Sequence, residues 1–337
     1  MTNPGVPIHS PVDNETGRPY LCEPLIVLPG DQLPGYFLSP HIDQLKDYGY
    51  LKVYEPTILT PDVFVERTQN ATVVLTQSMV LTAGIMSQLP SLKLIAIGSV
   101  GVDSIALSEA RRLGISVANI PGTTAYIVAE HALAMILGVS KGLVTETRSI
   151  LGGDWNSPTN VLLRGKTLGI LGMGPIGTEL ANLTVGLGME LLCWTFHPST
   201  KPIHPPGVRY VSLETLLRGS DVVVVCLALT EDTYHFIGAP QLALMKPGAF
   251  IINVARGPII DENALAQALN SGQIAGAGLD VFETEPIDPL SPILTAPNTI
   301  MTPHSAGNTA EAFELVDKEV VSNVIAFLKG RPVNICN

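Results

Sequence analysis

Basic residues are scarce in this chain, which carries 19 lysines and arginines against 30 acidic residues and a formal net charge of −11. No run of Lys or Arg occurs along it. Nucleic acids and membrane surfaces are polyanions and do not attract an acidic protein, so we expect neither as a partner. A small anionic ligand would instead need a local positive site.

Long apolar runs are also missing. The longest, Val222 to Leu229, is much shorter than a membrane span. Residues 1–17 are polar and lack the apolar core of a signal peptide. These features predict a protein outside the membrane and located in the cytoplasm.

Cysteine is rare, with four residues in a chain of 337. The four are not spaced as metal ligands, so no metal site is predicted. Cys193 and Cys226 lie in apolar, strand-like runs that are typical of buried thiols, which indicates a reducing compartment. A content of 46% hydrophobic and 15% charged residues is that of a well-buried globular protein, and the length suits two domains.

Short β-branched runs alternate with helix-like stretches in two series, one over residues 24–120 and one from Thr167 onwards. Such βα alternation predicts an α/β fold with parallel sheets covered by helices. Between the series, a helical pattern extends from about Ala125 to Lys141. A polar stretch, Gly152 to Asn160, follows it, and its composition places the domain junction there. Residues 309–330 form a further amphipathic segment whose docking place the pattern leaves open.

The first strand of the second series ends in Gly172-x-Gly174-x-x-Gly177, the spacing of a dinucleotide-binding loop. In a chain with 31 glycines this spacing alone is a weak signal, and a plain βα turn is the alternative. The context favours a nucleotide. Gly172 makes the tight turn, Gly174 allows a close approach, and Gly177 lets the helix pack on the strand. Pro175 and Ile176 begin a helix whose free N–H groups can receive a pyrophosphate.

The next strand ends without the acidic residue that would accept hydrogen bonds from the ribose of NAD. Thr195 stands there, and it could donate to a 2′-phosphate together with His197, Ser199 and Lys201. The pattern therefore leans slightly towards NADP. The alternative is that Thr195 simply hydrogen-bonds the ribose of NAD.

Three ionisable residues follow later strands of the same predicted sheet: Arg256, Glu285 and His304. The planar fork of Arg256 suits a carboxylate, and His304 titrates near working pH and suits acid–base chemistry. Glu285 could accept from the second imidazole nitrogen of His304. Each residue taken singly reads as an ordinary turn or loop residue. Their coincidence at strand ends beside a nucleotide loop favours reduction of a 2-keto acid.

These segments, INVARGPIIDE, AGLDVFETEP and MTPHSAGNT, resemble the D-isomer-specific 2-hydroxyacid dehydrogenase family, from about Leu92 to Asn308. The resemblance implies that Arg256 binds the substrate carboxylate, that Glu285 and His304 form the acid–base pair, and that Asp280 contacts the nicotinamide end. A substrate loop that assists Arg256 is implied at Ser99, Val100 and Gly101. Further cofactor contacts are implied at Thr195, Ala228, Thr233 and Val254, together with Arg256 and His304.

The resemblance also implies the fold: two doubly wound parallel-sheet domains, with a Rossmann-type cofactor domain inserted into a discontinuous, flavodoxin-like substrate domain. Its bounds would be residues 123–306 for the cofactor domain and 1–122 with 307–337 for the substrate domain, with the substrate between them. The stretch from Asn119 to Leu137 resembles the family's crossing segment and dimer interface, so a homodimer is expected. Two positions depart from the family: Thr195 replaces an acidic residue and Ala228 a proline.

Two alternatives stay open. A phosphite- or formate-type dehydrogenase would share the fold, although formate enzymes pair their His with Gln where this chain has Glu285, and they carry Asn where it has Thr124. A dinucleotide-sensing co-repressor could retain the same residues without turnover. With no added regulatory domain after Asn337, the chain is nearer to glyoxylate or hydroxypyruvate reductases than to the long phosphoglycerate dehydrogenases. The sequence does not identify the keto acid.

Overall fold

The computed structural model describes residues 23–32, 35–37, 39–196 and 205–337. The chain divides into two compact units, one formed by residues up to Pro121 together with Phe313–Asn337 and the other by Gly122–Ala312. The polar stretch from Gly152 to Asn160 lies inside the second unit, so the junction suggested by composition is wrong. All its residues are exposed, and their polarity therefore reflects contact with water and not a boundary.

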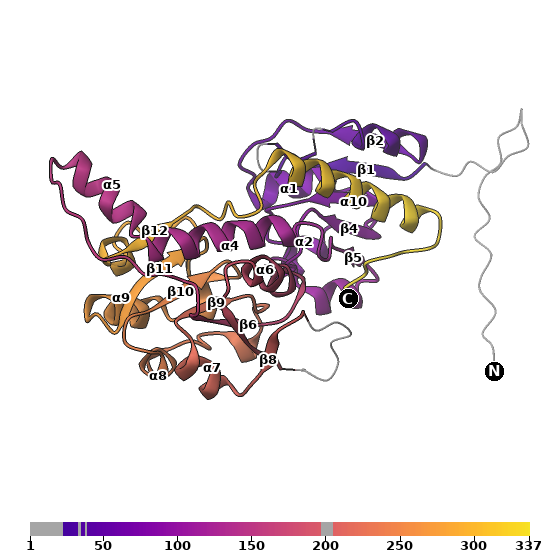
Figure 1. Ribbon diagram of the computed structural model, residues 1–337. Helices are drawn as coiled ribbons and strands as arrows, with labels where there is room; N and C mark the ends of the chain where they lie inside the picture. Colours follow the sequence, from indigo (N-terminus) through magenta and orange to yellow (C-terminus); the bar gives the residue numbers. More distant parts are fainter. Residues whose placement is uncertain (1–22, 33–34, 38, 197–204) are drawn as a thin grey trace, which may run out of the picture. The chain divides into compact units, whose positions relative to one another are not determined.

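The discontinuous unit contains a five-stranded sheet, visible in the indigo and purple part of Figure 1. Its strands are β1 (Leu25–Leu28), β2 (Tyr50–Val53), β3 (Val73–Thr76), β4 (Leu94–Ile97) and β5 (Ser116–Ala118). Its helices are η1 (Ile42–Asp47), α1 (Pro61–Thr68), α2 (Ala83–Met86), α3 (Leu107–Arg112) and most of α10 (Ala310–Leu328). All strands pair in parallel in the order β2-β1-β3-β4-β5, which is the flavodoxin-like order.

Alternate residues of its strands enter two different cores, as the period of a strand requires. Ile26 and Leu28 face one core, which includes Val316 and Val320 of α10, while Val27 faces the other. Helix α10 is further fixed by Asp317, whose carboxylate accepts from the backbone N–H groups of Phe37 (2.7 Å) and Ser39 (3.0 Å). The amphipathic segment whose place the pattern left open thus completes the first unit.

The contiguous unit contains a seven-stranded parallel sheet. Its strands are β6 (Thr167–Leu171), β7 (Glu190–Trp194), β8 (Val208–Tyr210), β9 (Val222–Val225), β10 (Ala249–Asn253), β11 (Ile274–Leu279) and β12 (Thr299–Met301). Its helices are α4 (Ala125–Ser140), α5 (Leu143–Leu151), α6 (Pro175–Val185), α7 (Leu213–Gly219), η3 (Glu231–Thr233), α8 (Ala239–Leu244), η4 (Gly257–Ile259), α9 (Glu262–Asn270) and η5 (Pro292–Thr295). Helix α4 confirms the helical pattern predicted over Ala125 to Lys141.

The strand order is β12-β11-β10-β9-β6-β7-β8, a Rossmann order with one added strand. Strand β9 is buried along its whole length, as is typical of a central parallel strand covered on both faces. Val222 and Val224 face a core shared with α4 and α6, and Val223 and Val225 face the core of α7 and α9. The predicted fold class is therefore confirmed: a Rossmann-type unit is inserted into a flavodoxin-like one.

Among the described residues, no single helix has the length and apolarity needed to cross a membrane. Helices α4 and α5 meet that requirement only when taken as a pair, and they are bent by 57° relative to each other.

Candidate active site

The glycine loop lies at the point where the strand order of the second sheet reverses. Gly172 follows β6 with φ of +99°, a left-handed conformation that favours glycine, and its N–H donates to the Trp194 carbonyl at 2.8 Å. A Cβ at Gly177 would overlap the Gly172 carbonyl oxygen, so only glycine lets α6 approach the turn this closely. Ligands of open α/β sheets bind at this switch point.

The start of α6 fits an anionic group. Gly174 is the N-cap residue and supplies no side chain to the first N–H groups of the helix, and Pro175 occupies the first turn. A Cβ at Gly174 would meet open space, which leaves room for a ligand against the backbone. A pyrophosphate would accept here from the N–H groups of Ile176 and Gly177.

Thr195 follows β7 directly and is partly exposed. Its neighbours pack as an aromatic cluster, in which the ring centroids of Trp194 and Phe236 lie 5.0 Å apart and those of Trp194 and Phe196 4.7 Å apart. His197, Ser199 and Lys201, the other suggested 2′-phosphate donors, lie outside the described residues.

Ala228 and Thr233 belong to one turn after β9. The Thr233 hydroxyl donates to the Ala228 carbonyl at 2.7 Å and accepts from the Thr230 N–H at 2.7 Å, and Thr233 is only 2% exposed. Ala228 itself is exposed. The Thr233 side chain therefore holds the turn from inside the protein. Val254, which directly follows the neighbouring strand β10, is also buried.

The three ionisable residues follow three strands that are neighbours in the sheet. Arg256 comes after β10, Glu285 after β11 and His304 after β12. Because parallel strands end at the same edge of a sheet, the fold brings residues that are up to 48 positions apart to one place.

His304 and Glu285 are in direct contact, with 2.6 Å between the imidazole Nδ1 and the carboxylate Oε2. The second carboxylate oxygen, Oε1, accepts from the Phe282 N–H at 3.0 Å. The hydrogen bond to Glu285 raises the pKa of His304, against burial and the charge of Arg256, which lower it. Burial raises the pKa of Glu285, but the bonds from His304 and Phe282 and the nearby charges outweigh it, so the net pKa is lowered. The pair therefore favours a protonated imidazole beside an ionised carboxylate.

His304 has φ of +50°, which is uncommon outside glycine and is held here by its surroundings. Its own N–H donates to the Asp280 carbonyl at 2.7 Å. The Asp280 carboxylate accepts from the N–H groups of Ser305 (2.8 Å) and Ala306 (3.0 Å) and from the Thr302 hydroxyl (2.6 Å). Asp280 is 1% exposed and so acts as the internal support of the histidine loop.

Arg256 stands at the start of a turn that Asn253 holds. The Asn253 side chain donates to the Arg256 carbonyl at 2.9 Å and accepts from the Ala255 N–H at 3.0 Å. One guanidinium N–H donates to the Ala255 carbonyl at 2.8 Å. The Arg256 side chain is half-buried, and its charge opposes the raised pKa of His304 and adds to the lowering of the pKa of Glu285.

Ser99, Val100 and Gly101 belong to the other unit, where they follow β4. The Ser99 carbonyl accepts from the Ile120 N–H at 3.3 Å and the Val100 carbonyl accepts from the Asn119 side chain at 2.7 Å, while the Val100 side chain is 39% exposed. The predicted substrate residues thus divide between the two units.

The sequence analysis missed three polar residues that support the site: Asn253, Thr302 and His131. Asn253 is the last residue of β10 and Thr302 directly follows β12, both within the segments that carry Arg256 and His304, and this placement was an available signal. His131 lies on the apolar helix α4, with its Nε2 3.1 Å from the Thr302 hydroxyl and 3.7 Å from the Asp280 carboxylate. An imidazole in an apolar helix was a weaker hint. Within the described part of the chain no group of three or more His, Cys, Asp or Glu could hold a metal ion.

A sheet of Rossmann order with a glycine turn at its switch point places the second unit in the class of dinucleotide-binding domains. The model of the "D-isomer specific 2-hydroxyacid dehydrogenase, NAD binding domain" matches residues 133–306. A glycerate dehydrogenase of Methylorubrum extorquens is 37% identical over 294 residues, which cover 84% of this chain and 91% of that protein. A glyoxylate reductase of Thermococcus litoralis is 40% identical over 263 residues, 75% of this chain and 79% of that one.

Among solved structures, an acyclic imino acid reductase in complex with NADPH and D-Arg superposes with a TM-score of 0.84 at 26% identity, covering 93% of this chain and 100% of the other. The chain belongs to the D-isomer-specific 2-hydroxyacid dehydrogenase family. It is an oxidoreductase that acts on the CH–OH group of donors with NAD or NADP as its cofactor.

Proposed function

We propose that this enzyme reduces a small 2-keto acid to the corresponding D-2-hydroxy acid, and catalyses the reverse reaction, with His304 as the proton donor. The observation that carries the proposal is the 2.6 Å contact between His304 and Glu285 beside Arg256, at the carboxyl edge of the dinucleotide-binding sheet. The bound nicotinamide supplies or accepts the hydride.

Each residue has one task in this scheme. Arg256 binds the substrate carboxylate through its guanidinium fork and orients the keto group. His304, protonated with the support of Glu285, donates a proton to the carbonyl oxygen as it becomes a hydroxyl, and in the reverse direction the neutral imidazole removes that proton. Glu285 remains ionised throughout. Backbone N–H groups at Val100 and Gly101 assist with the carboxylate.

For the substrate we propose an acid of the size of glyoxylate or hydroxypyruvate. Support comes from the relatives, which are named glycerate dehydrogenase and glyoxylate reductase. For the cofactor we propose that NADP is accepted, because Thr195 offers a hydroxyl where a carboxylate would repel the 2′-phosphate.

We further propose a cytoplasmic homodimer. Helix α5 extends away from the seven-stranded sheet of its unit (Figure 1), and none of its residues is buried. Leu151 is 82% exposed and Trp155, shortly after it, 89% exposed. Large apolar side chains exposed at several positions of one projecting segment are typical of a surface that a partner covers, and a second copy of the chain is the partner we infer.

The test is a panel of glyoxylate, hydroxypyruvate, pyruvate and bulkier 2-keto acids, each assayed with NADH and NADPH, together with phosphite and formate, each assayed with NAD⁺ and NADP⁺. Turnover of the small acids with NADPH supports the proposal. Turnover of phosphite or formate in place of keto acids would contradict it. Cofactor binding without turnover of any of these compounds would identify a dinucleotide-sensing protein instead.

A further inference from the structure

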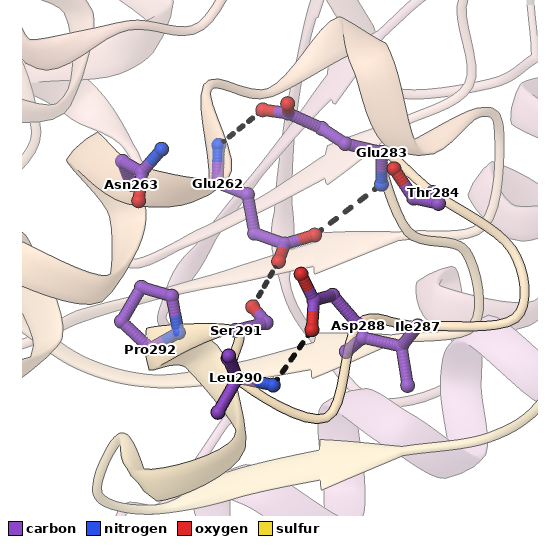
Figure 2. Close-up of a pocket in the computed structure, with 9 residues that line it drawn as sticks. All are labelled: Glu262, Asn263, Glu283, Thr284, Ile287, Asp288, Leu290, Ser291 and Pro292. Atoms are coloured by element: carbon purple, nitrogen blue, oxygen red, sulfur yellow. Dashed lines mark hydrogen bonds between the residues drawn. The ribbon is translucent and has the colours of Figure 1, made fainter.

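Two glutamates in the described structure bind each other's backbone. Glu262 is the first residue of α9, and Glu283 follows β11, two residues before Glu285. The Glu283 carboxylate accepts from the Glu262 N–H at 2.7 Å, and the Glu262 carboxylate accepts from the Glu283 N–H at 3.3 Å. Figure 2 shows these reciprocal bonds, which we name the Glu262–Glu283 clasp, in a recess of the surface.

The Ser291 hydroxyl is hydrogen-bonded to the clasp, and the His235 imidazole lies against it. The Ser291 hydroxyl, at the start of η5, donates to the other carboxylate oxygen of Glu262. On the opposite side, Nε2 of His235 lies 3.1 Å from the Glu283 carboxylate. Four separate segments of the unit therefore meet here, and both carboxylates are used to hold the backbone and side chains around them.

The clasp is linked to the catalytic pair through the backbone of Phe282. A Cβ at Gly257, the residue after Arg256, would overlap the carbonyl of Phe282, so the 282–283 peptide lies directly on the arginine turn. The Phe282 N–H in turn binds the Glu285 carboxylate at 3.0 Å, and the other oxygen of that carboxylate binds His304. Gly257 on one side and Glu262 on the other leave this backbone little room to move.

We propose that Glu283 and Glu262 are positioning residues for the reaction, which hold the 282–285 loop so that Glu285 faces His304 and Arg256 keeps its place. The inference rests on the proposed function of the His304–Glu285 pair. The new element is that a contact outside the pair, the Glu262–Glu283 clasp, sets the alignment of His304 and Glu285. The clasp does not need to touch the substrate to do so.

Two variants of Glu283 separate position from charge. Glu283→Ala removes the acceptor for the Glu262 N–H, whereas Glu283→Gln removes the charge but keeps a side-chain oxygen that accepts the same bond. If the clasp acts by position, Gln restores the parent behaviour and Ala does not. If it acts only through its negative charge, both variants behave alike.

Asp288 provides the matched control. Its carboxylate lines the same recess but accepts from the Leu290 N–H at 2.8 Å and takes no part in the clasp. Asp288→Asn therefore changes the charge of the recess while it leaves the 282–285 loop held. Besides the two glutamates of the clasp, the titratable groups that face it are His235 and, in the same recess, Asp288.

The experiment follows the titration of His304 by NMR. The imidazole signal of His304 is assigned as the one that is missing from the spectrum of His304→Gln. The pH profile of kcat is measured for the same variants. In Glu283→Ala we expect His304 to titrate at lower pH than in the parent and kcat for reduction to fall about tenfold or more, since displacement of a catalytic group is costly. Glu283→Gln and Asp288→Asn should stay within about threefold of the parent, as surface changes usually do. An unmoved His304 titration in Glu283→Ala, or equal losses in the Ala and Gln variants, would overturn the inference.

Glu262→Ala is the second variant, and it approaches the same peptide from the other side. It should move the His304 titration in the same direction, and a folded Glu262→Ala protein with the parent titration would overturn the inference independently. Failure of the proposed function would give a different result. In that case the His304→Gln variant would keep the keto-acid turnover of the parent enzyme. Loss of turnover in that variant with unmoved titrations in the clasp variants would contradict the clasp alone.

Discussion

The two units present different chemistry at the ends of their strands. In the seven-stranded unit, three neighbouring strands are each followed by an ionisable side chain, and Asp280 supports the last of them from within. In the five-stranded unit, the predicted substrate loop after β4 is Ser99-Val100-Gly101, with no charged side chain. We infer that one unit contributes reactive side chains and the other contributes backbone. Substitutions should therefore be costly in the first and tolerated in the second.

The largest effect is expected at His304. His304→Ala removes the proton donor and should lower kcat for keto-acid reduction by roughly 10²–10⁴-fold, the usual contribution of a general acid. Cofactor affinity should change far less than kcat, because His304 is only one of the expected cofactor contacts and the glycine loop is a separate segment of the sheet. Steady-state kinetics and a cofactor titration of the same sample measure both, and near-parent turnover would remove His304 from the mechanism.

Arg256→Lys tests whether geometry or charge matters in the carboxylate contact. Lysine retains the positive charge but cannot form the paired bonds of a guanidinium. Loss of one hydrogen bond between charged groups should raise the KM for the keto acid by about 10- to 100-fold. The measurement is KM at saturating cofactor, and an unchanged value would place the substrate carboxylate on another residue.

Glu285→Gln should shift the pH profile as well as lower the rate. Glu285 raises the pKa of His304, so a neutral amide should let that pKa fall. Reduction needs the protonated imidazole and should therefore fade at lower pH than in the parent, whereas oxidation, which needs the neutral form, should begin at lower pH. The loss of rate should be smaller than in His304→Ala, because the acid is weakened but not removed. Profiles in both directions check the sign, and coincident profiles would separate Glu285 from the histidine.

Thr195→Asp tests the cofactor end of the same unit. A carboxylate after β7 would accept from the ribose of NAD and repel the 2′-phosphate of NADP, so the preference should move towards NADH by about tenfold, as for a partly screened like-charge contact. The quantity to compare is the NADPH-to-NADH ratio of kcat/KM at saturating keto acid. A parent that already rejects NADPH as firmly as the variant would show that Thr195 serves only the ribose of NAD.

The smallest effect is expected in the other unit. Val100→Ala keeps the backbone N–H and removes only part of an exposed side chain, so KM and kcat should stay within about threefold of the parent. A loss as large as that of Arg256→Lys would end the contrast between the two units, because it would give the five-stranded unit an essential side chain.

Much of this arrangement was predictable because it depends on patterns local in sequence. The helical pattern of α4, the β-branched strands and the glycine turn each have a local signature. The domain junction was misplaced because the polarity of Gly152 to Asn160 reports exposure, which loops within a unit share with linkers. The clasp was not predictable, since Glu262 and Glu283 are ordinary acidic residues whose pairing depends on how two loops close in space. The hydrogen bond from the Thr233 hydroxyl to the Ala228 carbonyl was not predictable either, because it depends on the geometry of the turn.

The insertion of one unit into the other has a consequence for synthesis on the ribosome. The contiguous residues Gly122–Ala312 hold a complete core, whereas the sheet of β1 to β5 receives Val316, Val320 and Val324 only from α10. At about 5–20 residues per second, the intervening segment takes roughly 10–40 seconds to emerge. Throughout that interval one apolar face of the nascent first sheet lacks its helix. Chaperone capture of this chain should therefore centre on its earliest-made strands and end once α10 has left the exit tunnel.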